Sequence, residues 1–382
     1  MNEGMKAPPR LDADRLLDDP RTRIIVCCGS GGVGKTTTAA ALGLRAAERG
    51  RHVVVLTVDP ARRLAQSMGL SSLDNTPRPV PLPEGGTAAG GTLHAMMLDM
   101  KRTFDEIVET HAEPGRSEQI LANPFYQSLS SSFAGTQEYM AMEKLGQLRR
   151  SEQWDLIVVD TPPSRSALDF LDAPQRLSRF LDGRLLKLLT APTRTGGRAY
   201  LKVVNAGFGV ITGIVAKVLG AQVLRDVQTF IAALDTMFGG FRERAEDTYR
   251  LLQTPGTAFL VVATPEPDAL REASYCVERL SAARSLAAAE ALVPAGAAAQ
   301  TAYSAGGNGG AGALADVTRY PLAVAALRLH AERMQLIASE RRLAQGFTAA
   351  HPGVPVARVI AQPEDVYDLA GLRVIGESLT AD

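Results

Sequence analysis

The chain has 382 residues, of which 46% are hydrophobic and 21% are charged, so it is long enough to bury a sizeable core. Its 41 Lys and Arg residues equal its 41 Asp and Glu residues, and this balance argues against binding nucleic acid or anionic lipid through excess positive charge. The three cysteines form no Cys-x-x-Cys pair, so neither a disulfide framework nor the usual structural zinc site is expected. Residues 1–19 lack the apolar core of a signal peptide, and we expect a cytoplasmic protein.

Short apolar runs alternate with longer helical patterns along the chain, which is typical of parallel βαβ units. In chain order, strands are predicted at Arg23–Cys28, His52–Val58, Leu93–Leu98, Trp154–Asp160, Thr257–Ala263 and Val356–Ala361. A helix is predicted at about Lys35–Glu48, ending before Gly50. Because the strands carry few charges, we expect an α/β fold with a mostly parallel sheet flanked by helices.

Two intervals read as helices rather than strands, at about residues 101–153 and 164–253. We therefore predict a helical subdomain inserted into an α/β domain at residues 23–382, after an N-terminal extension at residues 1–22. Residues 291–315 carry no charge and are rich in Ala and Gly, which predicts a low-complexity loop.

The strongest chemical signal lies between the first predicted strand and the first predicted helix. The run Gly29–Thr36 fits G-x-x-x-x-G-K-[ST], a pattern whose glycines let backbone N–H groups converge on phosphate oxygens. Lys35 is expected to reach the β- and γ-phosphates of a nucleotide, and the Thr36 hydroxyl is expected to hold Mg²⁺. The motif predicts a P-loop NTPase fold whose phosphate-binding residues are Gly29, Ser30, Gly31, Gly32, Val33, Gly34, Lys35, Thr36 and Thr37.

Two aspartates end apolar strands. Asp160 closes the strand that precedes Thr-Pro-Pro, as in a Walker B strand, and Asp59 follows the strand at His52–Val58. Ligands of open α/β sheets bind at the carboxyl ends of the strands, so both carboxylates are expected to face the phosphate site. Asp160 is expected to bind Mg²⁺ through water, since this ion usually keeps several of its water ligands. The alternative for each aspartate is a turn or helix cap.

Five segments together resemble the arsenite-pump and tail-anchored-protein-targeting ATPases, a branch of the MinD-like P-loop ATPases. Within that family, the sequence is similar in particular to the actinobacterial "anion-transporting ATPase" members. The segments follow the family's order across most of the chain and are Gly31–Thr37, Asp59–Ala61, Asp160–Pro163, Thr264–Glu266 and Gln362–Val366.

This resemblance implies a dimeric switch enzyme that binds ATP or ADP with Mg²⁺. No zinc is expected, because the Cys-x-x-Cys zinc motif of the targeting members is absent from this sequence. It implies that Asp59 orients the attacking water and that Asp160 and Thr161 sense the γ-phosphate. Lys35, Asp59 and Asp160 are then the catalytic residues. It further assigns Gln362, Pro363 and Glu364 to the adenine pocket, and Pro265 to the nucleotide-binding residues.

The sequence departs from the family at Ser30, where relatives have a lysine that reaches the partner's phosphates across the dimer. Either hydrolysis is then slow for this chain alone, or a paralogous P-loop ATPase supplies the lysine in a heterodimer; Arg62 or Arg63 is the alternative cation. The family's next strand after the one at Thr257–Ala263, which ends in Asn, has no visible counterpart before Val356. It is either missing or concealed in the Ala-rich region.

The sequence therefore predicts an ATPase of this type that couples ATP binding and hydrolysis to a conformational change, for a membrane transporter or a hydrophobic client. The alternatives are a non-catalytic nucleotide-binding subunit of a heteromeric complex and a membrane-protein-targeting chaperone. The apolar segment Ala199–Leu224 fills a helical bundle or lines a client groove. A homodimer or heterodimer is expected, with no nucleic acid, in the cytoplasm and at the membrane only through a partner.

Overall fold

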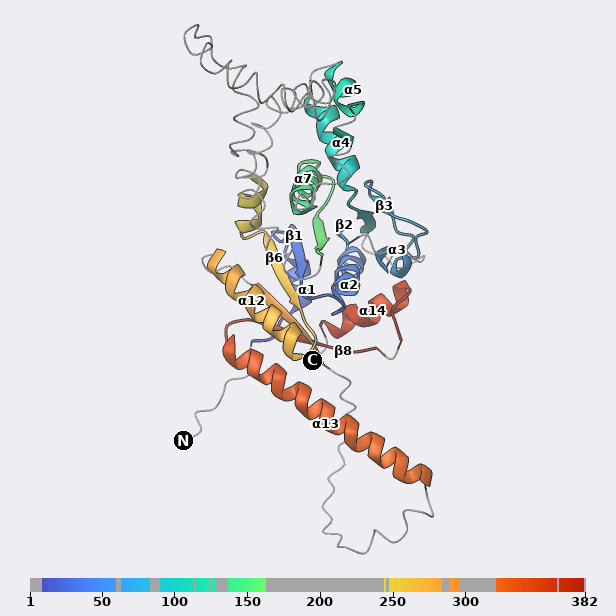
Figure 1. Cartoon of the computed structure of the whole chain (residues 1–382), viewed down its shortest axis with the longest axis vertical. Coiled ribbons are helices and arrows are strands. Elements are labelled where there is room, and N and C mark those ends of the chain that lie inside the picture. Colours follow the sequence, from blue (N-terminus) through green and yellow to red (C-terminus); the bar gives the residue numbers. More distant parts are fainter. Residues whose placement is uncertain are drawn as a thin grey trace, which may run out of the picture.

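The described strands form a single, mostly parallel sheet. The computed structural model describes residues 9–59, 63–82, 90–112, 115–123, 126–127, 137–162, 244, 247–283, 289–295, 321–362 and 364–380. Within them, eight strands pair in the order β3-β4-β2-β5-β1-β6-β7-β8, and every pairing is parallel except β3 with β4 (Figure 1). The strands are β1 (Ile24–Cys28), β2 (His52–Thr57), β3 (Arg78–Pro79), β4 (Thr92–Met97), β5 (Leu156–Asp160), β6 (Thr257–Val262), β7 (Ala289–Ala295) and β8 (Val356–Ile360).

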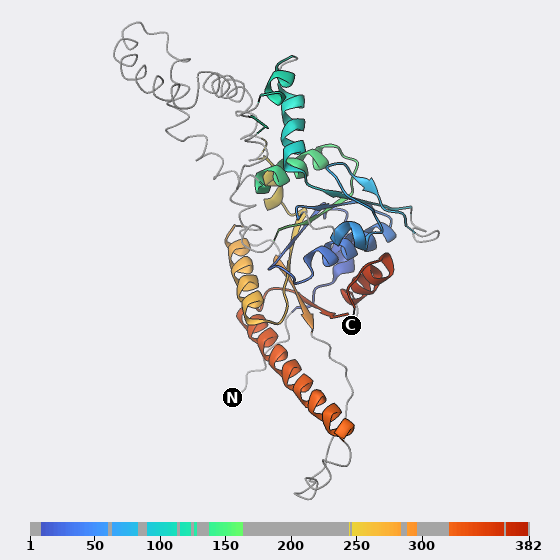
Figure 2. The ribbon, with the colours of Figure 1, turned by 45° about the vertical axis from the view of Figure 1, so that its right-hand side comes forward.

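Helices cover both faces of this sheet. On one face, α1 (Ala13–Asp18), α2 (Lys35–Glu48), α3 (Arg63–Ser67) and α14 (Leu369–Ser378) contribute to one buried apolar cluster. A second cluster on the other face receives residues from α4 (Met100–His111), α5 (Arg116–Leu121), α7 (Gln137–Arg150), α12 (Pro267–Ala283) and α13 (Pro321–Ala350). In Figure 1 and Figure 2, α13 continues beyond the sheet, while α4 and α5 lie at the opposite end of the molecule.

The central strands are buried on both faces, as their uninterrupted apolar sequences require. All five residues of β1 and all six of β6 are buried. Successive residues point to opposite faces, so Cys27 joins the cluster beside α2 and Cys28 joins the cluster beside α12. Both cysteines are therefore core residues, as their adjacent positions on one strand predict.

Helix α2 packs closely against the sheet because its inner face is made of small side chains. A Cβ added at Gly43 would lie 2.5 Å from Cγ2 of Val55, so only glycine fits there without movement. The helix begins after its N-cap, Gly34, and ends at Glu48, followed by its C-cap Arg49 and by Gly50 at a φ of 95°. Its predicted range is confirmed.

All six predicted strands are confirmed to within a residue or two at their ends, but the structure adds two that the sequence did not reveal. Strand β7 lies between β6 and β8, so of the two alternatives the missing strand is wrong and the strand concealed in the Ala-rich region is confirmed. Residues 291–295 of the expected low-complexity loop belong to this strand, which ends at Ala295 rather than at Asn. Pro294 pairs only with β8, because the pairing with β6 stops at Leu292.

The segment at residues 9–22 packs onto the α/β domain. Leu11 and Leu17 are buried, and the carboxylate of Asp14 accepts two hydrogen bonds from Arg45 of α2, at 2.6 and 2.7 Å. The backbone N–H of Leu11 donates to the carbonyl of Val356 in β8. In the second helical interval, the described residues 244 and 247–253 are helical, whereas Ala199–Leu224 lies outside the described residues.

Candidate functional site

The loop between β1 and α2 has backbone conformations that favour glycine. Gly29, Gly32 and Gly34 have φ values of 145°, 78° and 92°. Gly34 is the N-cap of α2, so the loop leads directly into the start of that helix, where unpaired N–H groups attract anions. Val33 is buried, and Thr37 is the third residue of α2. The loop therefore presents its backbone at the carboxyl end of the central strand β1.

Gly29 is the glycine that the surrounding structure restricts most. A Cβ added there would lie 2.0 Å from the carbonyl oxygen of Val262 in β6, whereas one added at Gly32 would meet no described atom within 4 Å. We expect Gly29→Ala to lower the free energy of unfolding by about 3 kcal/mol or more, and Gly32→Ala by about 1–2 kcal/mol. Urea titration of the two variants measures both effects, and equal losses would contradict the contact at Gly29.

Lys35 is folded back onto this loop. Its Nζ donates a hydrogen bond to the carbonyl oxygen of Ser30 at 2.7 Å, and the residue is 7% exposed. Burial lowers the pKa of Lys35, while the carboxylates of Asp160 and Asp59 act in the opposite direction. The loop thus holds a buried cation with two aspartates near it, as the sequence predicts.

Asp160 lies at the centre of the site, at the end of β5, and is fully buried. Its Oδ2 accepts hydrogen bonds from the hydroxyls of Thr36, at 2.7 Å, and Thr57, at 2.9 Å. Its Oδ1 is buried with no hydrogen-bond partner among the described residues. Burial raises the pKa of Asp160 to about 6, despite the two hydroxyls and Lys35, which favour the charged form.

An unsatisfied buried carboxylate oxygen beside a threonine hydroxyl fits a hydrated magnesium ion. Mg²⁺ binds to nucleotide phosphates, waters and only one or two protein oxygens. The described residues contain no cluster of three or more His, Cys, Asp or Glu side chains suited to a metal. Thr36 and Asp160 are the residues of this site that would hold the ion together with the phosphates.

The raised pKa of Asp160 predicts a pH-dependent penalty on stability. The ordinary pKa is 3.8 and the folded value is about 6, so between these pH values the folded chain binds more protons than the unfolded chain. Stability therefore falls as the pH rises from about 4 to about 6, by roughly 3 kcal/mol at most.

We expect Asp160→Asn to stabilise the nucleotide-free protein at pH 7.5 by up to roughly 3 kcal/mol, and to have little effect near pH 4. Urea unfolding at the two pH values measures the difference. Asp268→Asn is the matched control, because that side chain is 89% exposed. A variant no more stable than wild type at pH 7.5 would show that Asp160 carries no such penalty.

Asp59 is held next to this centre by its own backbone. Its N–H donates to Oγ1 of Thr57 at 3.2 Å, and the N–H of Val58 donates to the carbonyl of Asp160 at 3.0 Å. Strands β2 and β5 are neighbours, with Thr57 opposite Asp160 in the register. The structure thus brings Asp59 and Asp160 to the ends of the adjacent strands β2 and β5, and Lys35 to the start of α2 after β1.

Two site residues were missed in the sequence. Thr57 binds Asp160, and Gln137 donates from Nε2 to the carbonyl oxygen of Val58 at 2.9 Å. For Thr57, the weak sequence signal is a hydroxyl residue at the end of β2, two positions before Asp59. The second has no local signal, because Gln137 lies 79 residues from its acceptor.

The remaining candidate residues lie farther along the same edge of the sheet. Pro265 follows β6 and is buried, while Gln362 and Glu364 follow β8 and are half-buried and exposed, respectively. Strand β7 separates β6 from β8, so these residues are spread across the sheet rather than gathered at the loop. Pro363 lies outside the described residues.

Thr161, directly after Asp160, ties β5 to β1. Its hydroxyl donates to the carbonyl of Cys27 at 2.8 Å, and its N–H donates to the same oxygen at 3.3 Å. Burial raises the pKa of the thiols of Cys27 and Cys28 well above the usual value, so both stay protonated core groups.

A glycine loop between a central parallel strand and a helix, followed by a buried lysine and a threonine–aspartate pair, defines a P-loop nucleotide-binding protein. A family model described as anion-transporting ATPase matches residues 22–285, well over half of the 382 residues. The chain belongs to this anion-transporting ATPase family.

Individual relatives match shorter stretches. The chain is 31% identical over 174 residues to the "ATPase GET3" of Malassezia globosa, which covers 46% of this chain and 48% of that relative. It is 25% identical over 254 residues to the "ATPase ASNA1 homolog" of Cryptosporidium parvum, which covers 66% of this chain and 60% of that relative. The chain therefore spans about half to three fifths of the length of these curated relatives. None of the described helices is long and apolar enough to cross a bilayer.

Proposed function

We propose that this chain binds ATP with Mg²⁺ at the loop Gly29–Thr37, hydrolyses it, and uses the nucleotide to switch a dimer between two conformations. The observation that carries the proposal is the hydrogen bond of 2.7 Å between Thr36 and Asp160, beside an unsatisfied oxygen of Asp160 and the buried Lys35. A hydroxyl, a carboxylate and a cation in this arrangement suit a metal-bound triphosphate. Membership of the anion-transporting ATPase family supports ATP as the nucleotide.

Each side chain has a chemical task in this proposal. When bound, Mg²⁺ would neutralise charge on the phosphate oxygens. Lys35 adds positive charge at the β- and γ-phosphates, and the N–H groups of the glycine loop hold the same oxygens. Asp59 orients a water molecule at the end of β2. Pro265, Gln362, Pro363 and Glu364 contribute to binding of the nucleotide and its base.

The partner is the second part of the proposal. Ser30 supplies no positive charge, so a homodimer would have to hydrolyse ATP without a cation from this position of the partner. We propose a heterodimer with a paralogous P-loop ATPase that carries lysine at the corresponding position. Closure of the dimer on ATP would then act on a membrane transporter or a hydrophobic client.

Ser30 also favours a second function, that of a nucleotide-binding subunit without its own hydrolysis. The two functions differ in their dependence on Asp59. If the subunit is catalytic, Asp59→Asn lowers the turnover of the heterodimer. If it is non-catalytic, Asp59→Asn leaves turnover unchanged and Lys35→Ala prevents assembly.

ATP turnover of the purified chain, alone and mixed with such a paralogue, tests the proposal. Slow turnover alone and a large increase in the mixture are expected. Equal and rapid turnover with and without the paralogue would contradict the shared site. Turnover in neither sample would contradict the ATPase itself.

A further inference from the structure

The peptide group before Asp59 is held by a side chain from a distant helix. Gln137, the first residue of α7, donates from Nε2 to the carbonyl oxygen of Val58 at 2.9 Å. Asp59 is the next residue, so this bond fixes one end of the peptide that leads into it. A hydrogen bond from a side-chain amide to a partly buried carbonyl stabilises the folded state and restricts the orientation of that peptide group.

The same short segment is held from its other side by the metal-site residues. The hydroxyl of Thr57 donates to Asp160 at 2.9 Å, and the N–H of Asp59 donates to that hydroxyl oxygen at 3.2 Å. Residues 57–59 therefore lie between two anchors, one at the nucleotide site and one on α7. The backbone that carries the Asp59 side chain is therefore held at both of these points.

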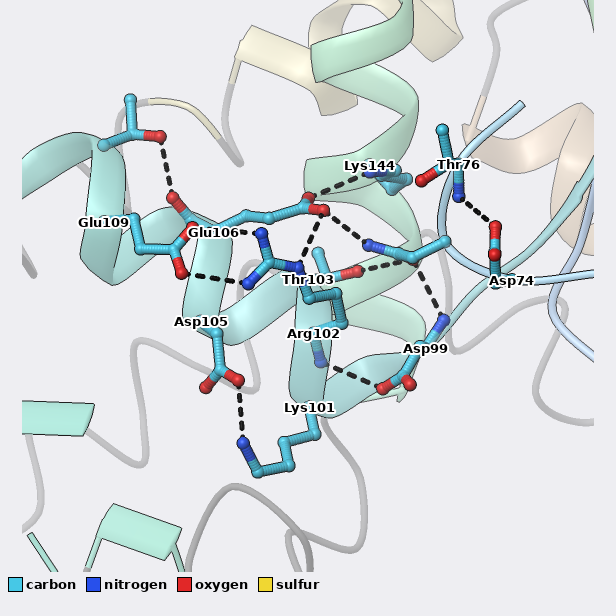
Figure 3. A network of polar contacts seen from close by, with 12 residues as sticks. Asp74, Thr76, Asp99, Lys101, Arg102, Thr103, Asp105, Glu106, Glu109 and Lys144 are labelled. Carbon is cyan, nitrogen blue, oxygen red and sulfur yellow. Dashed lines mark hydrogen bonds and ion pairs between the residues drawn. The ribbon is translucent and has the colours of Figure 1, made fainter. Parts of the chain in front are cut away.

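Helix α7 is itself a fixed support. Lys144 donates to Glu106 of α4 at 2.9 Å (Figure 3). Glu106 also accepts a hydrogen bond from Asn75 at 3.1 Å. The neighbouring Glu143, whose side chain is 1% exposed, pairs with Arg244 at 3.2 Å. Buried, hydrogen-bonded ion pairs of this kind are costly to break on one side only. The helix that carries Gln137 is thus tied to two other helical segments.

We propose that Gln137 is a positioning residue for hydrolysis, which holds the Val58 carbonyl so that Asp59 points at the attacking water. This inference rests on the proposed function. It assigns to Gln137 no contact with the nucleotide. Its loss should therefore slow the chemical step and leave nucleotide affinity unchanged.

Substitution of Gln137 by Met tests this role, because Met keeps a similar length but cannot donate a hydrogen bond. In single-turnover assays of the catalytically competent dimer, we expect the hydrolysis rate to fall about tenfold. In steady-state assays, we expect the KM for ATP to stay within about twofold of wild type. Gln137→Glu, which also removes the donor at neutral pH, should lower the rate at least as much. Gln147→Met, on the same helix, is the control and should leave the rate unchanged.

A double-mutant cycle separates positioning from simple destabilisation. In an Asp59→Asn background, Gln137→Met should cause no further loss of rate, because its effect passes through Asp59. The same loss in both backgrounds, a wild-type rate for Gln137→Met, or a rise in KM alone would each overturn the proposal. Failure of the proposed function looks different, since either the wild-type dimer would show no hydrolysis or Asp59→Asn alone would leave its rate unchanged.

Discussion

Lys35→Ala is expected to lower ATP turnover by roughly 10²- to 10³-fold, because it removes the one charge that the loop holds in place for the phosphates. The buried ammonium donates to the carbonyl oxygen of Ser30 at 2.7 Å, so its charge lies within the loop itself. The fold should survive. Burial lowers the pKa of Lys35, which means that the folded chain disfavours this charge in the nucleotide-free state.

Steady-state and single-turnover assays of Lys35→Ala measure this effect, with thermal unfolding to verify the fold. Lys101→Ala is the matched control, since Lys101 is 48% exposed and pairs with Asp105 on α4. Turnover close to that of wild type for Lys35→Ala would show that the loop is not the phosphate site.

Ser30→Lys is expected to raise the turnover of this chain alone by roughly 10³-fold or more, the effect of a cation supplied across a dimer in phosphoryl transfer. The Ser30 side chain is partly exposed, whereas its carbonyl accepts the bond from Lys35. A longer side chain can therefore be added without removing that bond. The gain should require dimerisation, so it should rise with protein concentration.

Ser30→Met is the control for side-chain length without charge, and its turnover should stay at the wild-type level. If Ser30→Lys is no faster than Ser30→Met, another group supplies the charge. Arg63 at the start of α3 is exposed and is the described residue to test next, whereas Arg62 lies outside the described residues.

The loop and the central strands could be predicted because their signals are local. An apolar run such as Leu156–Val159 that ends in Asp160 defines both a buried parallel strand and the position of its carboxylate. The glycines of the loop likewise predict the positive φ angles that the structure shows at Gly29, Gly32 and Gly34.

The missed features depend on contacts between distant parts of the chain. Strand β7 is poor in β-branched residues and contains Pro294, so it forms because β6 and β8 provide its hydrogen-bond partners. Gln137 reaches Val58 only because α7 is docked by Glu143 and Lys144, and no pattern near residue 137 reports that docking. Sequence reading therefore located the charged centre of the site and missed the residues that orient it.

Calorimetric titration of the 382-residue chain with ATP in the presence of Mg²⁺ tests the central claim most directly. Saturable binding at one site per chain, lost in Lys35→Ala and weakened when Mg²⁺ is removed, is the expected result. A folded wild-type protein that takes up neither ATP nor ADP would contradict a nucleotide site at the loop between β1 and α2.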